Sequence, residues 1–359
     1  MPQRHSGRPC AVQRCFVGLL SLLTLSTVSA GCSRNPLDSA PPTIEPAQAA
    51  VSPPVSQNPA GVVRPLAGHP AAAMFDGNAH QLAVLVPGAD PAAPAILAEF
   101  GDAHLAPRVI PLPGPATALT GDGRGTAYLA TRGGYFAVDL SSGHAAQVTV
   151  ADAEQADFTA IAQRADGRLV LGSADGAVYA LTSQTPTSAT VGSRNKIFAR
   201  VDALVAQGNT TVVLDRGQSS VTTIRADGHV EQALRAGDGA TTLAADPLDR
   251  VLVADTRGGQ LLVYGCCSPR TPLILRQAYP VRQSPYGLAG SRELAWVSLT
   301  ASNVVIGYDL STGIPVERVR YPTVQQPNSL AFDEASGTLY VVSGSGAGVQ
   351  IIEHAAGTP

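Results

Sequence analysis

The chain has 359 residues, of which 45% are hydrophobic and only 14% are charged, and its formal net charge is −3. This composition excludes a wholly disordered protein, because a chain with so few charges can bury enough apolar surface to fold. It also excludes a strongly basic surface for nucleic acid, and the 36 glycines and 28 prolines predict frequent turns in place of long helices.

The first 31 residues have the organisation of an export signal. Three arginines among the first 14 residues give a positive start, and an apolar run from Phe16 to Leu25 follows. This run is shorter than the about 20 apolar residues that a membrane-spanning helix needs. Small residues then lead to Gly31. We therefore expect residues 1–31 to be a signal peptide that is removed on export.

The residues Ser29-Ala30-Gly31-Cys32 resemble a bacterial lipobox, in which small residues precede a cysteine that receives diacylglycerol. The lipobox usually carries an aliphatic residue three positions before the cysteine, and Ser29 departs from that pattern. Ordinary signal cleavage near Ala30 is therefore the alternative. The resemblance implies a lipoprotein whose Cys32 carries acyl chains such as palmitate, anchored on the extracytoplasmic face of the cell membrane.

Residues 32–60 are rich in Pro, Ala and Ser and show no apolar periodicity. A segment of this composition has no face to bury against a core, and its prolines favour extended conformations. We expect residues 32–60 to be a disordered tether that holds a folded domain away from the membrane.

A repeat begins at about Pro70. Short β-rich runs alternate with turns of Gly, Asp, Ser and Asn, which predicts an all-β fold. A small residue followed by an aliphatic one recurs every 39 to 45 residues, close to the about 40–45 residues of a four-stranded β-propeller blade. The pairs are Ala73-Met74, Ala118-Leu119, Ala160-Ile161, Ala203-Leu204, Thr242-Leu243, Gly287-Leu288 and Ser329-Leu330.

Inside the repeat, two apolar runs flank a tight turn. In the fifth unit, Arg250–Ala254 and Gln260–Tyr264 are separated by a turn that ends in Gly258 and Gly259. Glycine supplies the positive φ that tight hairpins require. The runs are more apolar than strict alternation would give, as expected for strands covered on both faces. Each unit therefore predicts antiparallel strands within a stacked blade.

The last unit has residues for only three strands before the chain ends. The run Gly61–Leu66, before the first unit, has no partner of its own. We expect this run to be the fourth strand of the last blade, which closes the ring without an exposed inner edge. The prediction is one seven-bladed β-propeller of four-stranded antiparallel blades over residues 61–354, followed by a tail at 355–359. Six or eight blades are the alternatives.

Three segments carry a resemblance to known repeats. Residues 250–264 resemble the NHL repeat, and residues 303–313 and 338–352 look like the YVTN repeats of exported bacterial propellers. Together with the lipobox, the chain is similar to propeller lipoproteins of actinobacteria. These motifs specify strands and turns, so the resemblance implies a propeller and says little about activity.

Two of the five cysteines lie in the signal peptide, and Cys32 is the lipid acceptor. The remaining two, Cys266 and Cys267, are adjacent in a loop of the fifth unit. Outside the cytoplasm they can form a vicinal disulfide, which would act as a stiff contact for a ligand or as a redox-sensitive turn. A purely structural link, or two free loop thiols, are the alternatives.

The chain carries no catalytic motif. The histidines of the exported part lack metal-ligand spacing, no Gly-x-Ser-x-Gly sequence occurs, and the glycine-dense turns lack the spacing of a phosphate-binding loop. We therefore expect no catalytic residue, no metal and no cofactor.

If a ligand site exists, it lies where the turns between second and third strands and the crossovers into first strands surround one mouth of the channel. These positions carry side chains of mixed charge, for which ordinary turn chemistry is the alternative. The candidates are His69, Arg132, Phe158, Asp175, Arg200, Asp215, Arg216, Asp255, Arg257, Tyr286 and Asn328.

Two functions follow. The first is a monomeric, membrane-anchored binding or scaffold module of the cell envelope that takes a protein, peptide or glycan and not nucleic acid. The alternative is a metal-dependent propeller hydrolase, lactonase or lyase with its active site at the channel mouth. Such enzymes hold their metal with a Glu and a ring of Asn or Asp, and in this sequence Asn328 stands nearly alone.

Overall fold

Strands make up all of the regular structure. The computed structural model describes residues 41–101, 106–267 and 272–357, and in these ranges it contains 28 strands and no helix. Nothing in the described part of the chain is a helix long and apolar enough to span a membrane. The predicted all-β class is therefore confirmed. The predicted signal peptide over residues 1–31, Cys32 and the last two residues lie outside the described residues.

Five sheets have four strands each, and all of their pairings are antiparallel. The five are β2 (Ala72–Asp76), β3 (Gln81–Val86), β4 (Ile96–Phe100) and β5 (Arg108–Pro111); β14 (Ala203–Gln207), β15 (Thr210–Asp215), β16 (Ser220–Ile224) and β17 (Val230–Arg235); β18 (Ala240–Asp246), β19 (Arg250–Asp255), β20 (Gln260–Gly265) and β21 (Ile274–Pro280); β22 (Pro285–Gly290), β23 (Ala295–Leu299), β24 (Val304–Asp309) and β25 (Val316–Pro322); and β26 (Pro327–Asp333), β27 (Thr338–Ser343), β28 (Val349–Ile352) and β1 (Val62–Arg64).

The sixth sheet has eight strands, so the prediction of seven separate four-stranded blades is wrong as stated. Its strands are β6 (Ala118–Gly121), β7 (Thr126–Thr131), β8 (Gly134–Asp139), β9 (Ala145–Val150), β10 (Phe158–Gln163), β11 (Leu169–Ser173), β12 (Ala177–Gln184) and β13 (Ser188–Lys196). The reason is the long hairpin of β12 and β13. Its tip brings Ser188 and Ala189 alongside Thr149 and Val150, which joins β13 to β9 in a short parallel pairing.

The two ends of the folded chain meet in one sheet. Strand β1 pairs antiparallel with β28, and Val62 lies opposite Ile351. The approach is close at Gly61, where a Cβ atom would lie only 2.1 Å from the Ile351 carbonyl oxygen. The φ of Gly61 is +69°, which L side chains rarely adopt. Both the close contact and this φ therefore require glycine at position 61. The C-terminal tail also begins later than predicted, since Ala355 is buried and its carbonyl accepts a hydrogen bond from Tyr321 at 2.8 Å.

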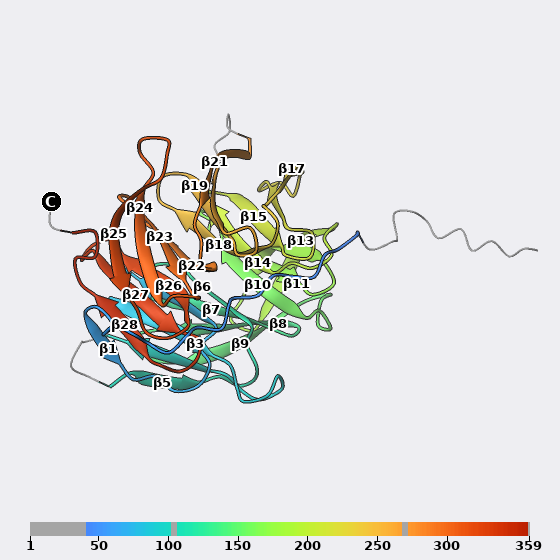
Figure 1. The fold of residues 1–359 in the computed structure, drawn as a ribbon. Helices are drawn as coiled ribbons and strands as arrows, with labels where there is room; N and C mark the ends of the chain where they lie inside the picture. The colour runs from blue at the N-terminus through green and yellow to red at the C-terminus, as the bar shows by residue number, and fades with distance from the viewer. Residues whose placement is uncertain (1–40, 102–105, 268–271, 358–359) are drawn as a thin grey trace, which may run out of the picture. The chain divides into compact units, whose positions relative to one another are not determined.

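The first strands of the units surround a common channel. Each first strand contacts the next in the order β2, β6, β10, β14, β18, β22 and β26, and β26 contacts β2. Figure 1 shows the sheets arranged around this centre. The hydrophobic core lies between neighbouring sheets, where Trp296 of β23 stacks on Phe332 of β26 with ring centroids 5.8 Å apart. Such layers are what apolar strands covered on both faces require.

Hydroxyl groups connect neighbouring units near the channel. Thr117 donates a hydrogen bond to the carbonyl of Phe158 at 2.7 Å, and Thr159 donates to the carbonyl of Val201 at 2.5 Å. Ser298 does the same for Pro327. These bonds satisfy carbonyls near the starts of the next units, where the strand register of Phe158 and Pro327 is irregular. They also fix the spacing of the units around the channel.

Candidate functional site

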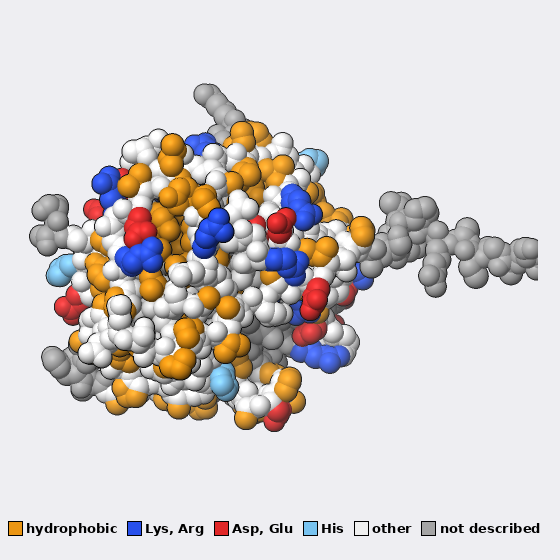
Figure 2. All heavy atoms as spheres, viewed as in Figure 1, with side chains coloured by type: hydrophobic (Ala, Val, Ile, Leu, Met, Phe, Trp, Pro, Cys, Tyr) orange, Lys and Arg blue, Asp and Glu red, His pale blue; other side chains and the backbone are white. Residues whose placement is uncertain are grey.

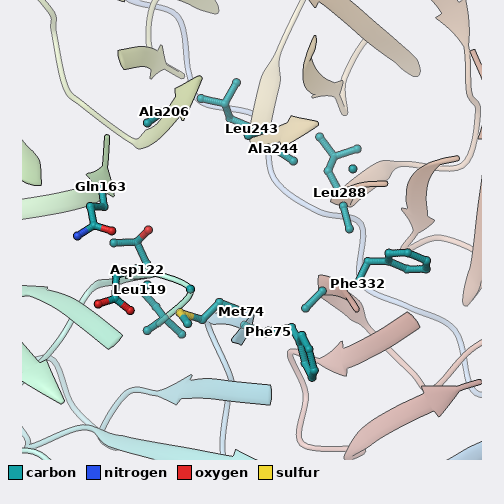
Figure 3. Close-up of a pocket in the computed structure, with 18 of the residues that line it drawn as sticks. Met74, Phe75, Leu119, Asp122, Gln163, Ala206, Leu243, Ala244, Leu288 and Phe332 are labelled. Carbon is teal, nitrogen blue, oxygen red and sulfur yellow. The ribbon is translucent and has the colours of Figure 1, made fainter. Parts of the chain in front are cut away.

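The channel has two open ends, which we call the front and back mouths. The front mouth is surrounded by the crossovers into the first strands and by the turns between second and third strands. The back mouth lies where the first strands end. The back half of the channel is a cavity of ≈680 Å³. Figure 3 shows the apolar side chains of Met74, Leu243 and Phe332 around it together with Asp122 and Gln163, so its wall combines apolar and polar groups.

The front half is a second cavity, of ≈480 Å³, and its lining includes polar groups. Asp202, Arg216 and Tyr286 line it together with small side chains of the first strands. The carboxylate of Asp202 accepts a hydrogen bond from the backbone N–H of Arg216 at 2.8 Å and pairs with the guanidinium of Arg200 at 3.2 Å. Burial raises the pKa of Asp202 despite these contacts. The Nε atom of Arg216 is buried without a hydrogen-bond partner among the described residues.

Two predicted rim carboxylates do not face the channel. Asp215 and Asp255 are both fully buried. Asp255 accepts hydrogen bonds from the backbone N–H groups of Asp238, Gly239 and Gly258 at 2.8 to 3.0 Å. Asp215 accepts hydrogen bonds from the backbone N–H groups of Ala199 and Arg200 in the preceding crossover. Both residues act as turn acceptors, which was the alternative interpretation of these positions.

The ring of Phe158 is also buried, in edge contact with Tyr179 at 5.3 Å, so it is part of the core. His69 is exposed, and its Nδ1 atom lies 3.2 Å from the carbonyl of Gly344. Arg132 is exposed and donates to Gln155 at 3.2 Å. These two residues lie outside the two cavities of the channel.

Asp175 forms an exposed cluster with basic residues. Its carboxylate lies 2.9 Å from Lys196 Nζ and accepts a hydrogen bond from Ser173 at 2.5 Å. Burial alone would raise the pKa of Asp175, but the hydrogen bonds from Ser173 and Lys196 outweigh it and lower the pKa. Asn328 accepts a hydrogen bond from Gln326 at 3.0 Å. Figure 2 shows positive and negative side chains interspersed on the visible face, without one large patch of either sign.

One segment bound to the front face was not predicted. Residues 44–53, which we call the strap, have no regular secondary structure but bind to the propeller through hydrogen bonds. The expected disordered tether over 32–60 is therefore wrong for the strap, while residues 32–40 lie outside the described part. In Figure 1 this blue segment runs across the view to β1 at the lower left.

Turns and crossovers of the last four units of the propeller hold the strap. At its start, the N–H of Ile44 donates to the carbonyl of Gly217 at 2.7 Å, and Arg257 donates to the carbonyl of Glu45 at 2.5 Å. Arg216 donates to the carbonyl of Ala47. Two of the predicted rim residues, Arg216 and Arg257, thus contact the chain's own N-terminal part.

The second half of the strap is held more tightly. Ser52 is buried, and its hydroxyl donates to the carbonyl of Thr300 at 2.5 Å and accepts from the N–H of Gln326 at 3.0 Å. The side chain of Gln326 accepts from the N–H of Ser52 at 2.9 Å, and the side chain of Gln325 donates to the carbonyl of Ser52 at 3.1 Å. Asn303 donates to the carbonyl of Pro53 at 2.8 Å. These contacts could not be predicted from the sequence, because the apolar residues of the strap show no regular spacing.

Cys266 and Cys267 are joined by a disulfide. Cys266 is buried and packs with Tyr264 and Leu273 in the core between two sheets. This position favours a structural link over a contact for a ligand.

Within the described ranges, no group of three or more His, Cys, Asp or Glu side chains is arranged to hold a metal ion.

The comparisons with known proteins agree with the fold. No family model and no curated protein matches the sequence. Among solved structures, the chain is similar to a streptogramin B lyase, with 9% identity and a TM-score of 0.62 over 82% of this chain and 96% of that one. It is also similar to virginiamycin B lyase from Staphylococcus aureus, with 10% identity and a TM-score of 0.64 over 81% of this chain and 99% of that one.

A third similar chain comes from a mitotic checkpoint complex, with 10% identity and a TM-score of 0.66 over 88% of this chain and 99% of that one. Identities this low show the fold alone. The fold is that of a β-propeller.

Proposed function

We propose that the propeller has seven blades, with the eight-stranded sheet counting as two, and that β1 closes the ring as the outer strand of the last blade. Two observations support this count. The first strands form one closed series of contacts that includes both β6 and β10 of the eight-stranded sheet. The pairing of Val62 with Ile351 places the two ends of the folded chain in one sheet.

We propose that the chain is a membrane-anchored binding or scaffold module of the cell envelope, attached through Cys32, and that its front mouth binds a protein, peptide or glycan. The supporting observation is the front cavity, a concave site whose lining combines small apolar side chains with polar groups such as Asp202, Arg216 and Tyr286. Concave sites with both kinds of group are where ligands usually bind. Most of the carboxylates near it are already used by turns or by ion pairs.

A channel-filling variant tests this proposal. Ala206 lines both cavities, so Ala206→Trp should fill the channel. Ala278→Trp is the matched control, because Ala278 is exposed on the outer strand β21. On arrays of glycans and peptides, the unmodified protein should bind a ligand that Ala206→Trp binds at least about tenfold more weakly, a loss of about 1.4 kcal/mol. Unchanged binding by Ala206→Trp, or chemical turnover of the bound molecule, would overturn the proposal.

The alternative is a metal-dependent hydrolase, lactonase or lyase at the channel mouth, and it is supported only by the two similar structures that are named lyases. Melting the same preparations with and without calcium or zinc separates the two functions. A specific ion at 100 times its Kd stabilises a protein by about 2.7 kcal/mol. A binding module should show no such gain, whereas a gain that Ala206→Trp abolishes would favour the enzyme.

A further inference from the structure

We propose that the front face carries a groove for extended peptide segments, that the strap is its built-in occupant, and that a partner protein's extended segment with small residues at two inward positions replaces it. This inference rests on the proposed function of the front face as a binding surface. It names the class of ligand and the residues that would hold it.

The groove recognises main chain. It bonds the N–H groups of Ile44, Ala50 and Ser52 and the carbonyls of Glu45, Ala47, Ala50, Ser52 and Pro53. Only one of the strap's side-chain groups, the Ser52 hydroxyl, takes part. Recognition through main-chain groups tolerates many sequences, as in other sites that bind extended peptides.

The groups that make these bonds belong to fixed parts of the propeller. Arg216, Arg257, Asn303, Gln325 and Gln326 supply side-chain donors from the turns and crossovers of the front face. The side chain of Asn303 is also held by accepting from the N–H of Gln326, and the backbone of Arg216 is held by its N–H bond to Asp202. The donors are therefore a built feature of the face, and a second extended chain could use the same set.

Side-chain size sets the selectivity of the groove. Ala47 and Ser52 are the two strap residues that are buried, and they are five positions apart. Ala47 lies against Gly239, where an added Cβ atom would come within 2.8 Å of the Ala47 Cβ atom. A large side chain at either position would clash, whereas Val51, which is 89% exposed, is free to vary. A ligand segment should therefore carry Ala, Ser or Gly at both inward positions.

The strap is suited to exchange. It buries only two small side chains, so little apolar surface holds it in place. Its advantage over a free peptide is its covalent link to β1, which gives it a high effective concentration at the groove. To displace the strap, a partner segment that makes the same main-chain bonds must add contacts through its outward side chains, such as the one at the position of Val51.

The test uses the full chain and a fluorescent synthetic peptide of residues 42–55. Ala47→Trp should prevent the strap from docking, and Ser52→Asp should release it by charge with little added bulk, in case the first variant folds poorly. Val51→Trp is the matched control, because it places the same ring at an exposed strap position. Limited proteolysis within residues 44–53 reports whether the strap has been released.

We expect the unmodified chain and Val51→Trp to bind the peptide weakly, and both release variants to bind it at least tenfold more tightly. Adding Arg257→Ala and Asn303→Ala to a release variant should remove that gain. The proposal is overturned if the strap stays protected in both release variants, or if a released strap leaves a groove that does not bind the peptide. Either failure leaves the channel experiment with Ala206→Trp unaffected, because that experiment measures a ligand of the channel.

Discussion

At the scale of single residues, carboxylates that suggest a binding rim are structural. Asp255 is the last residue of strand β19, before a glycine-rich turn, which is also where a ligand-binding acid would be expected. In the structure its two oxygens accept three backbone N–H groups. These bonds use three of the about four lone-pair sites of the carboxylate, and its full burial keeps it away from a ligand. The basic residues beside these turns are the ones that reach outward, as Arg216 and Arg257 do toward the strap.

Replacing Asp255 should therefore reduce stability. Asp255→Ala leaves three buried or partly buried N–H groups without an acceptor, and we expect the free energy of unfolding to fall by about 3 kcal/mol. Asp90→Ala is the control, because Asp90 is exposed and accepts from the N–H of Ala92 at 3.0 Å in an open turn; its effect should stay below about 1 kcal/mol. Urea unfolding measures both. A stable Asp255→Ala protein that had lost ligand binding would instead make Asp255 a binding residue.

At the scale of elements, the junction of β1 and β28 depends on a glycine. Gly61→Ala places a Cβ atom against the Ile351 carbonyl, and Gly123→Ala has nothing within 4 Å of its added atom at a similar φ of +66°. Both variants carry the backbone cost of alanine at positive φ, more than about 1 kcal/mol. Only Gly61→Ala should also weaken the junction, so it should unfold at lower urea. Equal midpoints for the two variants would contradict the close pairing of β1 with β28.

The strands themselves were largely predictable. Arg250–Ala254 and Gln260–Tyr264 were predicted as a pair, and they lie within β19 and β20 because apolar runs and a Gly-Gly turn are local signals. The joining of β9 to β13 was not predictable, since it depends on how far one hairpin extends toward another unit. The strap was missed because its Pro, Ala and Ser residues show no period, and its main chain is satisfied by distant side chains such as Gln326.

At the scale of the whole molecule, the site is divided between the channel and the strap. Among the charged and aromatic groups of the described residues, Asp202, Arg216 and Tyr286 line the front cavity. Of these, sequence reasoning included Arg216 and Tyr286 and missed Asp202. The sequence around Asp202 does not indicate that it lines a cavity, because its burial depends on how two neighbouring units pack.

The proposed membrane attachment belongs to the whole chain, because it would depend on Cys32 and not on the propeller. Each buried methylene of an acyl chain contributes about 0.8 kcal/mol of membrane affinity, so several chains would hold the protein firmly. In a bacterial host that processes lipoproteins, Cys32→Ala should move the protein from the membrane fraction to the soluble fraction, with an unchanged melting temperature. Ser39→Ala should remain in the membrane fraction, and its intact mass should include a diacylglycerol group. A Cys32→Ala protein that stayed with the membrane would show that something other than this lipid attaches it.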